Sequence, residues 1–196
     1  MQVTKNAHTE YGLGFGMAHV LGSQDHTTQE SIFAYLTDTH NSFSRGLGNG
    51  LGHIFPSLGE KNQVEVLRWI DRNATFAHSL GIGISLSFRY LDEILQIEIL
   101  RWIDKNIEFA RGLGNGLGHI FPSLGEKNQV EVLRWIDKNT EFAEAVGLGM
   151  VDSFRYLDKD RKDKIIALAR QSHNLAIVIQ ICNSPKTNQP TNGIDN

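Results

Sequence analysis

Apolar residues recur along most of the chain at intervals that alternate between three and four residues. This spacing places them on one stripe of an α-helix, which has about 3.6 residues per turn. Further apolar residues, such as Val66, Trp69 and Leu80, lie beside the stripe and widen the apolar arc to about half of the helix circumference. A helix with so wide an arc must contact two neighbours. The pattern therefore predicts an all-α protein, built as an antiparallel helical array or bundle.

The phase of this stripe predicts where the helices end. The phase jumps after Leu58, Leu91, Leu124 and Leu157, and it runs unbroken through each Asp-Lys-Asn or Asp-Arg-Asn triplet. Two of the jumps carry Pro-Ser-Leu-Gly-Glu, in which proline ends one helix and Ser-x-x-Glu is a capping box for the next. We therefore expect one long helix between successive jumps. The expected helices span residues 28–57, 62–91, 96–124, 129–157 and 160–182, after a short helix near residues 10–21.

An alternative interpretation adds a break at each Asp-Lys-Asn or Asp-Arg-Asn triplet. It gives two short helices per unit and a helix-turn-helix α-solenoid. The period of about 33 residues is close to that of tetratricopeptide repeats, but the consensus residues of that class do not align with this chain. Because the apolar phase continues through the triplets, the pattern favours the long helices.

The chain is internally repetitive. Residues 45–77 and residues 111–143 differ at only three of 33 positions, and the sequence around them repeats the same pattern in diverged form. We expect these units to form a single helical repeat domain over residues 1–182. The polar residues 183–196, which include two prolines, are expected to form a disordered tail. The units are 11–44, 45–77, 78–110, 111–143 and 144–176.

Glycine occupies every second position in segments 46–52 and 112–118. Each glycine inside a helix costs about 1 kcal/mol relative to alanine. Close approach of a neighbouring helix would offset this cost, because glycines four residues apart form a flat strip. In an antiparallel array, Trp69, Trp102 and Trp135 would lie opposite the glycines and fill the space that they leave.

A nucleotide-binding role for these glycines is disfavoured. The dinucleotide fingerprint requires Gly-x-Gly-x-x-Gly directly after a strand. After Gly46 and Gly48 the third position is Leu51, and no strand precedes the segment. We therefore expect packing rather than phosphate binding, and no cofactor.

Composition narrows the function only slightly. Nineteen basic residues face 22 acidic ones, for a net charge of −3, which argues against a dedicated nucleic-acid binder. A single cysteine fits a reducing compartment. The N-terminal residues lack the apolar core of a signal peptide, and no apolar run is long enough to cross a membrane. We therefore expect a cytoplasmic protein without membrane insertion.

The other candidate chemistry has a structural explanation. His19, His53 and His119 occupy equivalent positions one or two units apart, about 10 Å or more, which is too far for one metal ion. The three tryptophans suit helix packing better than an exposed stacking ladder. Segment 158–163 lacks the glycine and glutamate of a calcium loop, and Cys182 has no recognisable protease context. We expect no enzyme activity and no metal site.

One outward-facing surface stands out. It consists of a pair of residues four apart in each unit, which should be polar on a solvated helix. Ile82 and Leu86 are apolar there, although the flanking units carry asparagine and histidine. Clustered apolar groups of this kind mark either a partner surface or a face that packs within the monomer. The pairs are Phe15/His19, Asn49/His53, Ile82/Leu86, Asn115/His119 and Leu148/Asp152.

These observations lead to two hypotheses for function. The first is a non-enzymatic scaffold or protein-interaction module, which binds a protein partner or self-associates into an oligomer. The second is a carrier of a small apolar ligand or lipid in a Gly-lined pocket between helices. Neither requires nucleic acid.

Overall fold

The computed structural model describes residues 2–21, 24, 26–34, 41–169 and 172–183. Over these residues the protein is helical and contains no strand, which confirms the all-α prediction. Residues 184–196, most of the predicted tail, lie outside the described residues. The helices are α1 (Gln2–Leu21), α2 (His26–Ala34), α3 (Asn41–Ile54), α4 (Glu60–Arg68), α5 (Ala74–Ser87), α6 (Glu93–Arg101), α7 (Ile107–Ile120), α8 (Glu126–Lys138), α9 (Thr140–Ser153), α10 (Lys159–Ala169) and α11 (His173–Asn183).

Short 3-10 segments extend several of these helices. They carry the Phe-Pro-Ser or Phe-Arg-Tyr sequence that ends an inner helix, or the Trp-Ile-Asp sequence that ends α4 or α6. The segments are η2 (Phe55–Ser57), η3 (Trp69–Arg72), η4 (Phe88–Tyr90), η5 (Trp102–Asp104), η6 (Phe121–Ser123) and η7 (Phe154–Tyr156).

The prediction of one long helix per unit is wrong, because the chain turns a corner at each Asp-Lys-Asn or Asp-Arg-Asn triplet. Asn73, Asn106 and Asn139 have extended backbones and act as N-caps of α5, α7 and α9. Each asparagine Oδ1 accepts a hydrogen bond from the backbone N–H three residues later, at N–O distances of 2.8, 3.0 and 2.9 Å. A one-residue corner leaves the spacing of apolar residues unchanged, so the apolar phase carries no sign of it.

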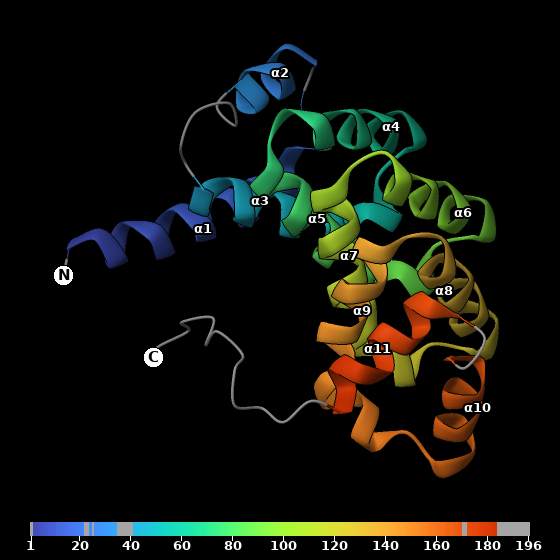
Figure 1. Cartoon of the computed structure of the whole chain (residues 1–196). Helices are drawn as coiled ribbons and strands as arrows, with labels where there is room; N and C mark the ends of the chain where they lie inside the picture. The colour runs from blue at the N-terminus through green and yellow to red at the C-terminus, as the bar shows by residue number, and fades with distance from the viewer. Residues whose placement is uncertain (1, 22–23, 25, 35–40, 170–171, 184–196) are drawn as a thin grey trace.

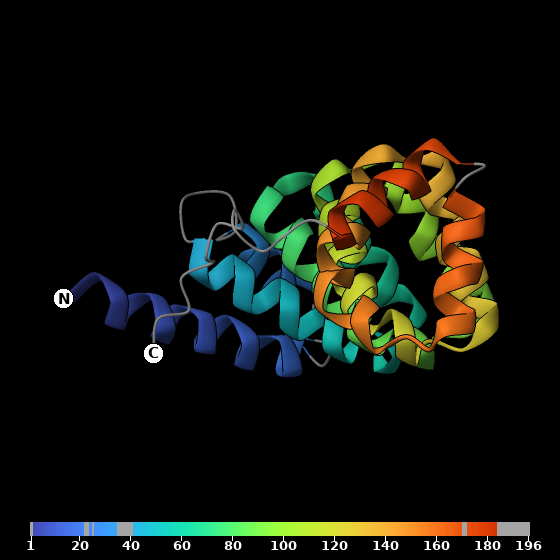
Figure 2. The ribbon, with the colours of Figure 1, turned by 60° about the horizontal axis from the view of Figure 1, so that its bottom comes forward.

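The corners fold the chain into two layers. The odd-numbered helices from α1 to α11 pack side by side, each against the next, and form an inner layer. The even-numbered helices from α2 to α10 follow the outer side of the curve (Figure 1), and the turned view shows the same succession (Figure 2). Because each outer helix reverses the chain, neighbouring inner helices run parallel to one another.

The glycines sit between the inner helices. A β-carbon at Gly52 would lie 2.5 Å from the backbone nitrogen of Ile84 and 2.6 Å from the carbonyl oxygen of Leu80. At Gly48 it would lie 2.6 Å from the Phe76 oxygen. These atoms belong to the next inner helix, so the expectation that tryptophans fill the space beside the glycines is wrong. Glycine lets the inner helices approach more closely than the outer ones, which accounts for the curvature.

The core lies between the two layers. Phenylalanines at both ends of the inner helices are fully buried, including Phe55, Phe76, Phe88 and Phe109. Trp69 is buried too, whereas Trp102 and Trp135 are half-buried and carry lysine ammonium groups 4.5 and 4.9 Å from their ring centroids.

Hydrogen bonds from polar side chains also link successive units of the chain. The Ser87 hydroxyl donates to the carbonyl oxygen of Gly52 at 2.9 Å, and Ser153 donates to Gly118 in the same way, also at 2.9 Å. Asn106 Nδ2 donates to Asp71 Oδ1 at 3.1 Å. The corner asparagine therefore caps its own helix and also holds the preceding unit.

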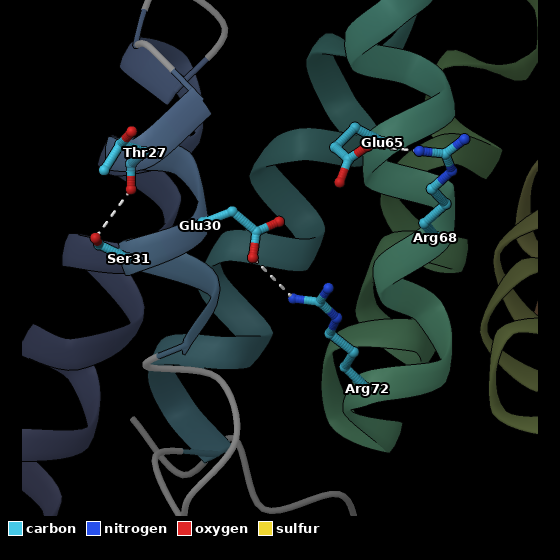
Figure 3. Close-up of polar contacts among 6 residues, drawn as sticks. All are labelled: Thr27, Glu30, Ser31, Glu65, Arg68 and Arg72. Carbon is cyan, nitrogen blue, oxygen red and sulfur yellow. Dashed lines mark hydrogen bonds and ion pairs between the residues drawn. The ribbon is translucent and has the colours of Figure 1, made fainter.

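Helix α2 packs at the N-terminal end of the outer layer. Glu30 on α2 pairs with Arg72 on η3 at 3.3 Å, as Figure 3 shows, while Glu65 and Arg68 pair within α4 at 3.2 Å. Both pairs have an exposed arginine, and neither is buried, so they contribute little stability. The placement of α2 rests instead on apolar contacts, since Ile32 packs against the core.

Replacing Ile107 with proline tests the corner directly. Ile107 is the first residue of α7, where proline is tolerated, and the extended backbone of Asn106 suits a residue that precedes proline. We expect the free energy of unfolding to change by less than about 1 kcal/mol in urea titrations. Arg111→Pro, inside the same helix, is the control and should cost about 3 kcal/mol. Equal losses for the two variants would contradict the corner.

Candidate interaction surface

The ten residues of the predicted outward surface lie on the exposed side of the inner helices. In α3, α5, α7 and α9, the residue four positions before each predicted pair and the residue four positions after it lie on the same side of the helix. Each helix therefore presents a column of four residues, of which the last belongs to the 3-10 segment. The columns are Arg45, Asn49, His53 and Ser57; His78, Ile82, Leu86 and Tyr90; Arg111, Asn115, His119 and Ser123; and Glu144, Leu148, Asp152 and Tyr156.

At the N-terminal end the predicted residues form an aromatic and polar cluster. The Phe15 ring lies 5.4 Å from the His19 ring and 6.1 Å from the His53 ring, both in edge-on geometry. Asn49 Nδ2 donates to the Tyr11 hydroxyl at 3.1 Å. Phe15 and Asn49 are therefore half-buried by the packing of α1 on α3, while His19 and His53 remain exposed.

The second column is the most apolar of those that α3, α5 and α7 present. Ile82 is half-buried, Leu86 keeps 39% of its surface exposed and Tyr90 keeps 65%. In the next polar pair, Asn115 is half-buried and His119 is exposed. The structure thus leaves Leu86 of the predicted pair open to solvent and covers Ile82 in part within the monomer.

A groove of about 380 Å³ opens beside Leu86, between the carboxyl ends of α3 and α5. Its size is near the lower end of the range for ligand pockets, which suits a side chain or a short segment. Two predicted surface residues, His53 and Leu86, line it. The other lining residues are Pro56, Ser57, Ser87, Arg89 and Tyr90.

Arg89 supplies a positive charge at this groove. Its guanidinium lies 4.7 Å from the Tyr90 ring centroid and donates to the Tyr90 hydroxyl at 2.6 Å. None of the described carboxylates forms an ion pair with it. In the duplicated block, 66 residues later, Asp152 replaces Leu86 and pairs with Arg155. Because position 86 holds leucine where the duplicated block holds Asp152, Arg89 lacks the carboxylate partner that Arg155 has.

His78 lies at the head of the second column and is half-buried. Burial between α5 and α7 lowers the pKa of its imidazole, and the charges of Arg45 and Arg111 lower it further, against the opposing effect of Glu108.

Leu148 and Asp152 in the fourth unit are both exposed, with Leu148 at 51%.

Sequence reasoning missed Arg89 and Tyr90. Both lie at a phase jump, where the pattern predicts a helix end and side chains leave the helical rows. The sequence did contain a signal for these two residues. The segment that ends each inner helix alternates between Phe-Pro-Ser and Phe-Arg-Tyr from one unit to the next.

Cys182 lies half-buried on α11. Burial raises the pKa of the Cys182 thiol to about 11, so the thiol stays protonated. Within the described part of the chain, no three His, Cys, Asp or Glu side chains gather as a metal site. The described helices also include none that is both long and apolar enough to span a bilayer.

Comparisons of the chain with models of known protein families, with curated proteins and with solved structures found no match.

Proposed function

We propose that this chain is a non-enzymatic α-solenoid of tandem repeats that acts as a protein-interaction module. In this proposal the groove of the second unit binds an extended partner segment with an apolar side chain next to a carboxylate. Leu86 and Tyr90 contact the apolar side chain, and Arg89 pairs with the carboxylate. The observation that carries the proposal is the Leu86 position, where an exposed apolar residue replaces the aspartate of the duplicated block.

The arrangement of the units supports a binding role. Repeat arrays present extended surfaces on their inner side, and near-identical units differ in the residues that they expose there. Here the first and third columns are polar, and the second is apolar. The carrier alternative has lost its motivation, because the space expected beside the glycines is occupied by the backbone of the neighbouring helix.

A peptide selection followed by direct binding tests the proposal. A library of random displayed peptides is selected on the immobilised full chain, and an enriched peptide is labelled and titrated by fluorescence anisotropy. We expect peptides that combine an aliphatic or aromatic residue with an acidic one. Leu86→Asp should weaken binding at least about tenfold, since a buried aliphatic contact is lost and a carboxylate now neutralises Arg89.

Leu148→Asp is the matched control, because it places the same charge on the same face but outside the groove. It should leave the affinity unchanged. Equal losses for both variants, or enrichment of peptides that bind Leu86→Asp as well as the natural chain, would overturn the proposal.

A further inference from the structure

The columns of α3 and α5 lie side by side with corresponding residues at the same level. A β-carbon at Gly83 on α5 would meet the carbonyl oxygen of Asn49 on α3, one repeat earlier in the chain. Because the two helices run parallel, the repeat sets Arg45 level with His78 and Asn49 level with Ile82. The groove lies at the carboxyl end of this pair of columns, and Arg45 lies at the amino end.

The apolar residues of this face follow the axis of α5. Ile82, Leu86 and Tyr90 are four residues apart and form one line. Across the helices at the level of Leu86, the neighbouring columns present the imidazoles of His53 and His119 instead. A partner segment therefore meets more apolar surface along α5 than across the inner layer.

Arg45 places a second positive charge on this face. Its side chain is exposed, and burial together with the Arg45 charge lowers the pKa of the His78 imidazole, so the guanidinium acts toward α5. Arg111, at the same level on α7, pairs with Glu108 at 2.8 Å. Arg45 has no such ion pair with any described carboxylate, and in this respect it matches Arg89.

The spacing between the two arginines suits an extended chain. Arg45 lies level with His78, and Arg89 follows His78 by 11 residues, which is about 16 Å along a helix. An extended segment rises about 3.3 Å per residue, so about five residues cover this length. Alternate side chains of such a segment are about 6.6 Å apart, close to the roughly 6 Å between Ile82 and Leu86 along the axis.

We propose that the partner segment lies along α5 in an extended conformation and carries a second carboxylate, which pairs with Arg45. This inference rests on the proposed function, because the first carboxylate is the one that pairs with Arg89. Between the two carboxylates, alternate apolar side chains contact Ile82 and Leu86. The two charge pairs fix the register of the segment on the face. The partner motif is acidic, any, apolar, any, apolar, acidic, read in either direction.

Parallel selections of random displayed peptides on the immobilised natural chain and on Arg45→Gln test this motif. The selected peptides are sequenced and aligned on their adjacent apolar and acidic residues. On the natural chain, we expect a second acidic residue to be enriched about five positions from the first. On Arg45→Gln that enrichment should disappear while the apolar and acidic pair persists. Arg45→Lys retains the charge and should retain the second acidic residue.

Fluorescence anisotropy of one enriched peptide gives the size of the effect. Changing its second acidic residue to the corresponding amide should weaken binding to the natural chain about threefold, as expected for an exposed ion pair. The same change should have no effect on binding to Arg45→Gln. Arg68→Gln removes an equal charge from the exposed side of α4 and is the matched control, so it should bind like the natural chain.

The outcomes separate this inference from the proposed function. Peptides that share the apolar and acidic pair but lack a second acidic residue would overturn the inference and leave the proposed function standing. Peptides without that pair, or no enrichment at all, would overturn both. Persistence of the second acidic residue on Arg45→Gln would also overturn the inference, and so would loss of helical circular dichroism in that variant, because Arg45 would then support the fold.

Discussion

Gly52→Ala is expected to destabilise the protein by about 3 kcal/mol, although alanine is the better helix former. The added methyl carbon would lie 2.5 Å from the Ile84 nitrogen and 2.6 Å from the Leu80 oxygen. These are backbone atoms, so relief requires α3 and α5 to move apart along their length. Separation would also weaken the hydrogen bond from Ser87 to the Gly52 carbonyl. The loss should appear as a lower midpoint in urea unfolding followed by circular dichroism.

Gly59→Ala is the control for this prediction. Gly59 precedes α4 with a φ of −61°, and a β-carbon there meets nothing within 4 Å. Alanine at this position should change the free energy of unfolding by less than about 1 kcal/mol. If Gly52→Ala proved as stable as Gly59→Ala or more so, the inner helices would not be in backbone contact.

Trp69→Ala should be about as damaging, with a loss of 3–5 kcal/mol, whereas the same change at Trp135 should cost markedly less. Trp69 is 1% exposed and packs in the core beside Leu51 and Val66. Trp135 is half-buried, with the Lys138 ammonium 4.9 Å from its ring centroid on the solvent side. Removing Trp135 therefore leaves a smaller cavity and loses an exposed cation–π contact.

The comparison of the two tryptophan variants uses urea unfolding under identical conditions. Tryptophan fluorescence quenching by iodide supplies an independent readout, since Trp69 should be protected in a variant that retains only that tryptophan. Equal losses of stability at the two positions would contradict the difference in burial between otherwise equivalent units.

The sequence predicted the helical class because that class depends on local periodicity. The spacing of apolar residues is the same on both sides of Asn106. The helical segments were therefore identified, but the predicted number of helices was wrong. The asparagine itself was the signal, since it is a preferred N-cap residue. Close packing at the glycines was predicted correctly, but its partner was not. The tryptophan-bearing half of an adjacent antiparallel helix was expected to lie opposite Gly52. The corner at Asn73 instead brings the next glycine-containing helix, α5, to that position.

The groove illustrates a different limit. His53 and Leu86 were selected from their positions on a helix, which sequence periodicity can give. Arg89 and Tyr90 follow the last regular turn of α5, and the path of the chain at that point depends on the short 3-10 segment η4. Their convergence with Pro56 and Ser57 requires the parallel stacking of α3 and α5, which the antiparallel interpretation excluded.

Distances between spin labels on the inner face test the parallel stacking most directly. Cysteines replace Asn49, Ile82 and Asn115 in pairs, in a Cys182→Ser background. Parallel inner helices are about 8–10 Å apart per step, so the distance from position 49 to position 115 should be about twice that from position 49 to position 82. Long antiparallel helices would offset positions 49 and 82 by roughly 18 Å along the axis. A distance between positions 49 and 82 that equals or exceeds the distance between 49 and 115 would contradict the stacked inner layer.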